Sequence, residues 1–125
     1  MEDGRISGIV IGAAIEVHRN LGPGLLESVY EQCLAHVLTT RGVQFQRQKA
    51  IPVKFDGIFM DCGFRADFIV ESSVVVELKA IEALAPIHTA QLPTYLKLTG
   101  CKIGLLINFN CARLHQGIKR VVLNL

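Results

Sequence analysis

The stretch Arg65-Ala66-Asp67-Phe68-Ile69-Val70, with Glu71-Ser72-Ser73 and then Val74-Val75-Val76-Glu77-Leu78-Lys79, decides the fold. Two runs rich in branched apolar residues, separated by polar residues, predict an antiparallel pair of largely buried strands. If the loop covers residues 71–73, Val70 pairs with Val74. The same register then places Asp67 directly opposite Glu77, with Cβ atoms ~5 Å apart.

Asp67 and Glu77 would place two like charges among apolar neighbours, which is unfavourable unless a positive charge neutralises them. A divalent cation does this well, because hard oxygen ligands suit Mg²⁺ or Mn²⁺. Lys79, two residues after Glu77 on the same face, supplies a second positive charge. The plainer alternative is that Glu77 and Lys79 form an ion pair on an edge strand, while Asp67 points to solvent.

Apolar spacing and turn residues predict the elements around this hairpin. Asp56-Gly57 is a hairpin turn signal, and a late helix that crosses over to a strand favours an α/β fold with a mixed sheet. The expected order is two helices, over about 6–19 and from 25 to a stop at Gly42, strands over 43–48, 51–55 and 58–62, the decisive hairpin, a helix over 86–98, and strands over 102–109 and 118–123.

Glu27 is placed where it borders the apolar stripe of the second helix, formed by residues from Leu25 to Leu38. From there its carboxylate can reach inward to the hairpin. It can equally serve only to favour the positive N-terminus of the helix. Glu31, one turn later, is expected to face solvent.

His88, Gln91 and Tyr95 share one stripe of the third helix. This stripe could contact a phosphate or a base, or it could be a surface stripe with Tyr95 half-buried. Pro93 lies inside the helix and predicts a kink or a late helix start.

The bulk composition indicates one compact domain. The chain has 125 residues, of which 50% are hydrophobic, with a net charge of +2, which permits a phosphate-bearing partner without requiring one. Four cysteines without a CxxC motif are expected to be reduced thiols. The start of the chain does not resemble a signal peptide, and the apolar stretch 9–17 is too short to span a membrane. We therefore expect a cytoplasmic protein.

Several linked motifs together resemble the small bacterial GxxExxY proteins, in which Gly24, Glu27 and Tyr30 are the named positions. This family is grouped with the PD-(D/E)XK nuclease-like superfamily. The resemblance covers nearly the whole chain, through residues 14–18, 21–30, 65–70, 76–80, 90–100 and 104–109.

The resemblance implies a restriction-endonuclease-like core with a mixed β-sheet flanked by helices. Asp67, Glu77 and Lys79 match the motif that names the superfamily, with Ala66 where the name-giving Pro would stand. Glu27 is similar to a helical Glu that some members add to the metal site. Gln91 and Tyr95 resemble the Gln-x-x-x-Tyr helix of exonuclease-like members, which faces the nucleic acid.

The sequence therefore predicts a metal-dependent nuclease acting on DNA or RNA. Asp67, Glu77 and the backbone carbonyl of Leu78 would bind Mg²⁺ (or Mn²⁺), with Glu27 for the same or a second ion. Lys79 would orient the attacking water or stabilise developing charge. The alternatives are a catalytically silent nucleic-acid-binding module and a protein adaptor on the same fold. A homodimer would give so small a domain more surface for gripping a duplex.

Overall fold

The computed structural model describes residues 2–61 and 64–123. The strands predicted over 65–70 and 74–79 are confirmed with these bounds, whereas Cys62, the last residue of another predicted strand, lies outside the described residues. In chain order the elements are α1 (Glu2–Leu21), α2 (Glu27–Thr40), β1 (Phe45–Ala50), β2 (Val53–Phe55), β3 (Ile58–Met60), β4 (Arg65–Val70), β5 (Val74–Lys79), α3 (Pro86–Thr99), β6 (Ile103–Asn108), the 3₁₀ turn η1 (Leu114–Gly117) and β7 (Ile118–Val122).

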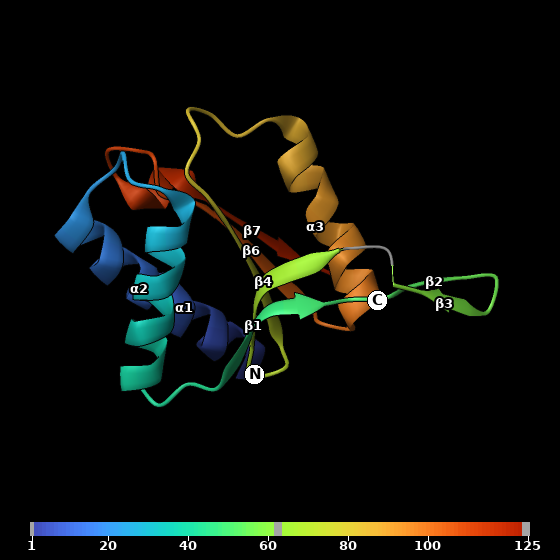
Figure 1. Ribbon diagram of the computed structural model, residues 1–125. Coiled ribbons are helices and arrows are strands. Elements are labelled where there is room, and N and C mark those ends of the chain that lie inside the picture. Colours follow the sequence, from blue (N-terminus) through green and yellow to red (C-terminus); the bar gives the residue numbers. More distant parts are fainter. Residues whose placement is uncertain (1, 62–63, 124–125) are drawn as a thin grey trace.

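The main sheet has the strand order β1-β4-β5-β6-β7 (Figure 1). β4 and β5 are antiparallel, and Val70 pairs with Val74 as predicted. α3 connects β5 to β6, which are parallel, so the sheet is mixed. The predicted α/β fold with a mixed β-sheet flanked by helices is confirmed.

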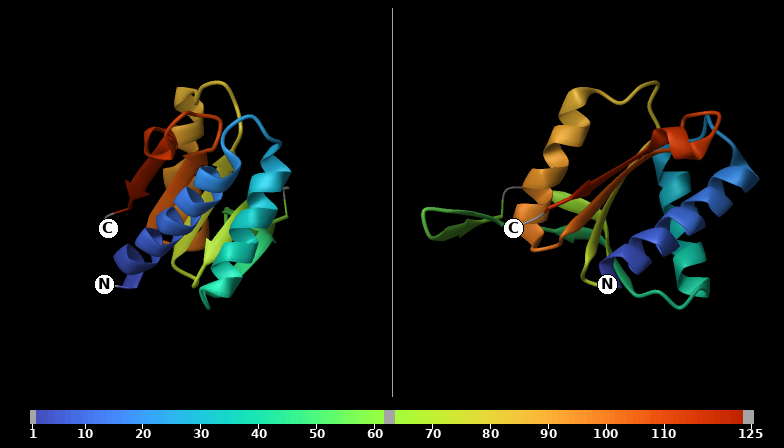
Figure 2. Two further views of the ribbon diagram at one scale, coloured as in Figure 1. Left: turned by 90° about the vertical axis from the view of Figure 1, so that its left-hand side faces the viewer. Right: turned by 180° about the vertical axis from the view of Figure 1, so that it is seen from behind.

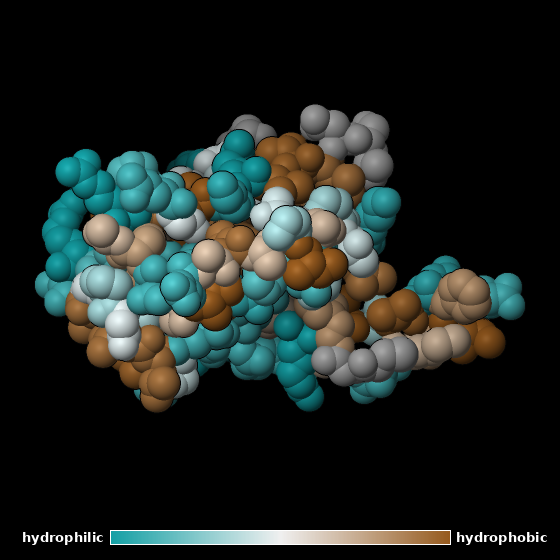
Figure 3. All heavy atoms as spheres, turned by 90° about the horizontal axis from the view of Figure 1, so that it is seen from above, coloured by the Kyte–Doolittle hydropathy of each residue, from teal (hydrophilic) through white to brown (hydrophobic). Residues whose placement is uncertain are grey.

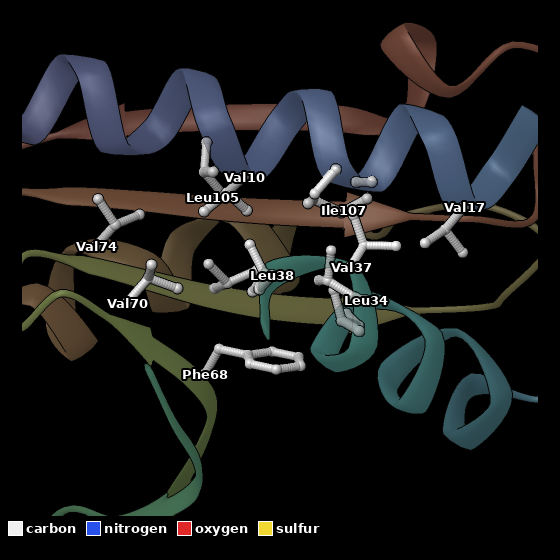
Figure 4. Close-up of a cluster of buried hydrophobic side chains, with 14 of the residues drawn as sticks. Val10, Val17, Leu34, Val37, Leu38, Phe68, Val70, Val74, Leu105 and Ile107 are labelled. Atoms are coloured by element: carbon white, nitrogen blue, oxygen red, sulfur yellow. The ribbon is translucent and has the colours of Figure 1, made fainter. Parts of the chain in front are cut away.

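Helices cover both faces of this sheet (Figure 2). The α1–α2 cluster joins α1 and α2 to one face, and the close-up in Figure 4 shows its side chains interleaving, among them Val10, Leu34, Phe68 and Leu105. A smaller α3 cluster on the other face includes Ile51, Ala66, Ile69, Val75 and Leu96. Each buried aliphatic side chain contributes roughly 1.5–3 kcal/mol, so both layers hold the sheet between them.

The prediction that the apolar face of the second helix begins at Leu25 is wrong. Leu25 and Leu26 precede α2, and Leu26 is 73% exposed. Val29 also lies on the outer side, with 37% exposure. The buried face of the helix begins at Tyr30, because the residues after Pro23 belong to a turn and not to the helical repeat.

β1 begins two residues later than predicted, and a separate hairpin follows it. Val43 bonds through its N–H to the Leu38 carbonyl (3.0 Å) and so completes the end of α2 instead of starting a strand. β2 and β3 pair only with each other and project from the body of the molecule (Figure 1). Asp56 (φ 55°) and Gly57 (φ 74°) make the predicted turn between them.

None of the helices in the described ranges is long and apolar enough to cross a membrane. Of the cysteines in those ranges, Cys101 is buried while Cys33 and Cys111 are half-buried, and all three are free thiols.

Candidate active site

The side chains of β4 change faces at Asp67. Phe68 packs in the α1–α2 cluster, whereas Ala66 packs in the α3 cluster. Residues two apart share a face in a regular strand, so the alternation is broken between them. The backbone ladder with β5 extends as far as Phe68 and Val76, and side chains take over the bonding beyond that point.

The Asp67 carboxylate accepts a bond from the backbone of β5, and the Glu77 carboxylate accepts one from the backbone of β4. The Asp67 N–H donates to Glu77 Oε2 (2.8 Å), and the Leu78 N–H donates to Asp67 Oδ2 (2.8 Å). The two acids that the register predicts to face each other are thus held side by side, at the point where the two strands stop pairing through their backbones.

β1 is irregular at the same level of the sheet. Its ladder with β4 keeps one register on both sides of Gln48, with Arg47 opposite Phe68 and Lys49 opposite Ala66. Gln48 itself has a φ of 50°, in the left-handed region that few non-glycine residues adopt. The disturbance of β4 at Asp67 is therefore matched by one in the neighbouring strand.

Glu31 of α2 joins this cluster, so the expectation that it faces solvent is wrong. The Gln48 amide donates to Glu31 Oε1 (2.9 Å) and to Asp67 Oδ1 (3.0 Å). Arg47 forms a salt bridge with Glu31 (3.0 Å), whose side chain is only 13% exposed. The helix position predicted the direction of Glu31 poorly because its partners on β1 depend on the left-handed residue.

The acids at this edge are held in a poorly hydrated, negatively charged setting. Burial, and then the neighbouring Asp67 carboxylate, raises the pKa of Glu77 to about 8. Burial also raises the pKa of Asp67 and, together with the Asp67 charge, that of Glu27. The Lys79 ammonium acts in the opposite direction and lowers the pKa of all three. One lysine therefore faces a surplus of negative charge.

Lys79 is positioned at the end of β5 by the neighbouring parallel strand. It pairs with Asn108, and its carbonyl accepts a bond from the Phe109 N–H (2.9 Å). The buried Asn108 side chain clamps the next segment, accepting from the Ile81 N–H (3.1 Å) and donating to the Ile81 carbonyl (3.0 Å). These bonds fix the backbone that follows β5 at Ile81.

Glu27 is the first residue of α2, and Tyr30 anchors the turn that precedes it. The Tyr30 ring is fully buried and stacks on Phe109, with centroids 4.5 Å apart. Its hydroxyl donates to the Gly22 carbonyl (2.7 Å) and accepts from the Leu25 N–H (3.1 Å). The spacing of Glu27 and Tyr30 thus has a physical reason: the tyrosine sets where the helix, and the acid, begin.

Tyr95 of α3 reaches the same charged edge. Burial, followed by the Glu77 and Asp67 charges, raises the pKa of its hydroxyl. Its ring stacks on Phe64, with centroids 3.9 Å apart. Gln91, one helical turn earlier, is half-buried. The charges of Glu77 and Asp67 therefore act on the Tyr95 hydroxyl, and Gln91 lies on the same helix.

The other candidates on the helices have structural partners. His88 Nδ1 accepts a bond from the Ala85 N–H (2.9 Å) and so caps the start of α3. His18 is buried and bonds through Nε2 to the Cys111 carbonyl (2.8 Å). Pro93 lies inside α3, which begins at Pro86, so the predicted late helix start is wrong.

Comparison with known proteins gives one match. A family model described as the PD-(D/E)XK nuclease superfamily matches residues 4–121. The chain belongs to the PD-(D/E)XK nuclease superfamily. Searches of curated proteins and of solved structures gave no match. Nucleases of this superfamily generally use divalent metal ions, so the fit of such an ion to these residues can be tested directly.

The donor set of this superfamily member suits a hard divalent cation. Asp67 and Glu77 offer carboxylate oxygens, and Leu78 between Glu77 and Lys79 offers a backbone carbonyl. Within residues 2–61 and 64–123, the only salt bridges are Arg41–Glu16 and Arg47–Glu31, so neither acid is neutralised by a direct ion pair. Each carboxylate oxygen keeps a free lone pair after its hydrogen bonds.

In the part of the chain that the structure describes, no three His, Cys, Asp or Glu side chains group closely enough to hold an ion together. A Mg²⁺ ion in proteins commonly takes one or two carboxylates and completes its shell with water. Glu27 is exposed; the Asp67 charge acts on Glu27, and the Glu27 charge acts on Glu77.

Sequence reasoning missed two members of this PD-(D/E)XK site region, Gln48 and Asn108, and misplaced Glu31. Asn108 carried a signal, since it is a polar residue at the end of an otherwise apolar buried strand. Glu31 lies one turn from Glu27, which was a second usable signal. Gln48 carried none, because its role depends on a backbone conformation that its residue type disfavours.

Proposed function

We propose that the protein is a metal-dependent nuclease that hydrolyses phosphodiester bonds in DNA or RNA. The observation that carries this proposal is the pair of bonds by which Asp67 and Glu77 each accept a backbone N–H from the other's strand. Lys79 lies on β5 with Glu77, two residues later. Two acids with raised pKa values beside one lysine are poorly neutralised in the protein alone. A cation and a phosphate would complete the charge balance.

Asp67, Glu77 and the Leu78 carbonyl would hold Mg²⁺ or Mn²⁺. When bound, such an ion supplies Lewis acidity at the scissile phosphate and lowers the pKa of an attacking water. The chain itself positions the two carboxylates, through the bonds that link β4 and β5. Glu27 would accept a proton from, or orient, a water at the open side of the site.

Lys79 would stabilise the negative charge that develops on the phosphate. Its backbone is fixed by pairing with Asn108 and by the bond from the Phe109 N–H, so the side chain starts from a fixed point beside Glu77. Lys79 can also orient the water that attacks.

Tyr95 and Gln91 would contact the nucleic acid strand. Tyr95, stacked on Phe64, places a rigid aromatic pair at the edge of the site, and aromatic side chains bind bases by stacking. We further propose that residues 1–125 form a single domain acting in the cytoplasm, and that a homodimer provides additional surface for a duplex.

The first experiment compares the melting temperature of wild type and Asp67→Ala with and without Mg²⁺ and Mn²⁺, followed by cleavage assays on DNA and RNA. We expect the ions to raise the melting temperature of wild type alone, and wild type to cleave. Metal binding without cleavage would favour a silent nucleic-acid-binding module. No rise with either ion would contradict the metal site and favour a protein adaptor.

A further inference from the structure

Gln48 adopts a backbone conformation that its own side chain disfavours. Its φ is 50°, and in this region the Cβ atom of an L-residue crowds the following carbonyl. Gln48 is also exposed, so burial of its side chain does not explain the conformation. Two kinds of contact accompany the conformation: the Gln48 carbonyl accepts a bond from the exposed Arg65 guanidinium (3.2 Å), and its side-chain amide bonds to two carboxylates.

The left-handed residue directs two consecutive side chains to one acid. Neighbouring side chains of a regular strand point to opposite faces, yet Arg47 and Gln48 both donate to Glu31 (3.0 and 2.9 Å). The same Gln48 nitrogen also donates to Asp67 Oδ1 (3.0 Å). The strand distortion therefore delivers one amide group to two carboxylates.

An amide nitrogen carries two hydrogens, one for each of these acceptors. The Glu31 charge raises the pKa of Asp67, and the hydrogen bond from the Gln48 amide acts against this repulsion. Asp67 is held on both oxygens, by Gln48 on Oδ1 and by the Leu78 N–H on Oδ2. One hydrogen bond on each oxygen restricts the rotation of the carboxylate, and each oxygen keeps a second lone pair.

We infer that Gln48 is a positioning residue that fixes the orientation of Asp67 for cation binding, and that the left-handed conformation of β1 serves to place its amide. The inference rests on the proposed function, because it requires Asp67 to be a metal ligand. Gln48 acts through Asp67. Substitution of a residue that hydrogen-bonds to a metal ligand typically lowers metal affinity 10–100-fold.

Two substitutions separate the amide from the backbone conformation. Gln48→Gly removes the amide and accepts a φ of 50° without strain, whereas Gln48→Ala removes the amide and keeps the strain. Gln46→Gly, at an exposed position of the same strand, is the matched control. The measurements are the melting temperature without metal and the titration of each protein with MnCl₂, in which EPR spectroscopy counts the free Mn²⁺.

We expect both Gln48 variants to bind Mn²⁺ roughly 10-fold more weakly than wild type. Gln48→Gly should nevertheless melt at a higher temperature than Gln48→Ala, and Gln46→Gly should bind Mn²⁺ as wild type does. Wild-type affinity in Gln48→Gly would overturn the positioning role alone and leave the metal site intact. Absence of Mn²⁺ binding in wild type itself would overturn the proposed function, and the role of Gln48 with it.

Discussion

The sheet edge around Asp67 keeps acidic side chains partly buried from water, whereas the β2–β3 hairpin exposes apolar side chains to water. At the edge, burial raises the pKa of Asp67 and Glu77. On the hairpin, Phe55 is 69% exposed and Phe59 is 67% exposed, and Figure 3 shows this apolar arm projecting from the body. A buried acid weakens the fold unless it is neutralised, while an exposed apolar side chain makes few contacts that its removal could break. The two regions should therefore respond to substitution in opposite ways.

The largest contrast is expected in catalysis. Lys79→Ala should reduce cleavage roughly 10³-fold, or about 4 kcal/mol in the barrier, because it removes the positive charge beside the proposed site. Lys54→Ala removes the same charge from the hairpin and should keep cleavage within about 2-fold of wild type. Initial rates on labelled DNA and RNA at saturating Mg²⁺ measure both. A Lys79→Ala protein with half the wild-type rate would remove Lys79 from the mechanism.

The next contrast is in the pH dependence of stability without metal. The pKa of Glu77 is about 8 in the folded protein and 4.5 in its reference state. Between these values only the folded chain keeps the proton, so raising the pH through this window favours the unfolded chain. Below 4.5 both states hold the proton, and above 8 both have released it.

We therefore expect the melting temperature of wild type in EDTA to fall by roughly 15 °C between pH 4.5 and 8. Glu77→Gln, which cannot ionise, should show a clearly flatter curve and should be the more stable protein at pH 8. Calorimetry across this range makes the comparison. Parallel curves for the two proteins would show that Glu77 ionises normally in the fold.

A smaller effect is expected where the site depends on a turn. Tyr30→Phe removes both hydroxyl bonds that hold the turn before Glu27, and the free energy of unfolding should fall by about 1–2 kcal/mol. Urea denaturation provides the measurement. Tyr95→Phe, which removes a hydroxyl from a half-buried ring, should lower the free energy of unfolding by less than half as much. Equal losses would deny Tyr30 its special role.

Much of the fold followed from local patterns, because those patterns report burial. β4 and β5 were predicted with their observed bounds, since each is a branched apolar run ended by polar residues. The mixed sheet followed from the order of a strand, a helix and a strand. β1 was displaced by two residues because its composition is polar, and an edge strand with the sequence Phe45–Ala50 has no apolar alternation to mark it.

The candidate site was less predictable than the fold for a physical reason. Asp67, Glu77 and Lys79 lie on a hairpin, so a local register brings them together. Glu31 and Gln48 meet them only through the packing of α2 on the sheet and a left-handed residue in β1. Neither the packing distance nor the backbone strain is written in a short stretch of sequence.

The smallest effect is expected on the hairpin itself. Phe55→Ala should change the free energy of unfolding by less than ~0.5 kcal/mol and leave Mn²⁺ affinity unchanged, because this ring is mostly exposed. Phe68→Ala is the same chemical change in β4, where the ring is fully buried, and should lower the free energy of unfolding by ~3–5 kcal/mol. Urea denaturation of the two variants tests the contrast. A loss above ~1 kcal/mol for Phe55→Ala would mean that the hairpin packs against the body or another chain in solution, because an exposed ring leaves no cavity when it is removed.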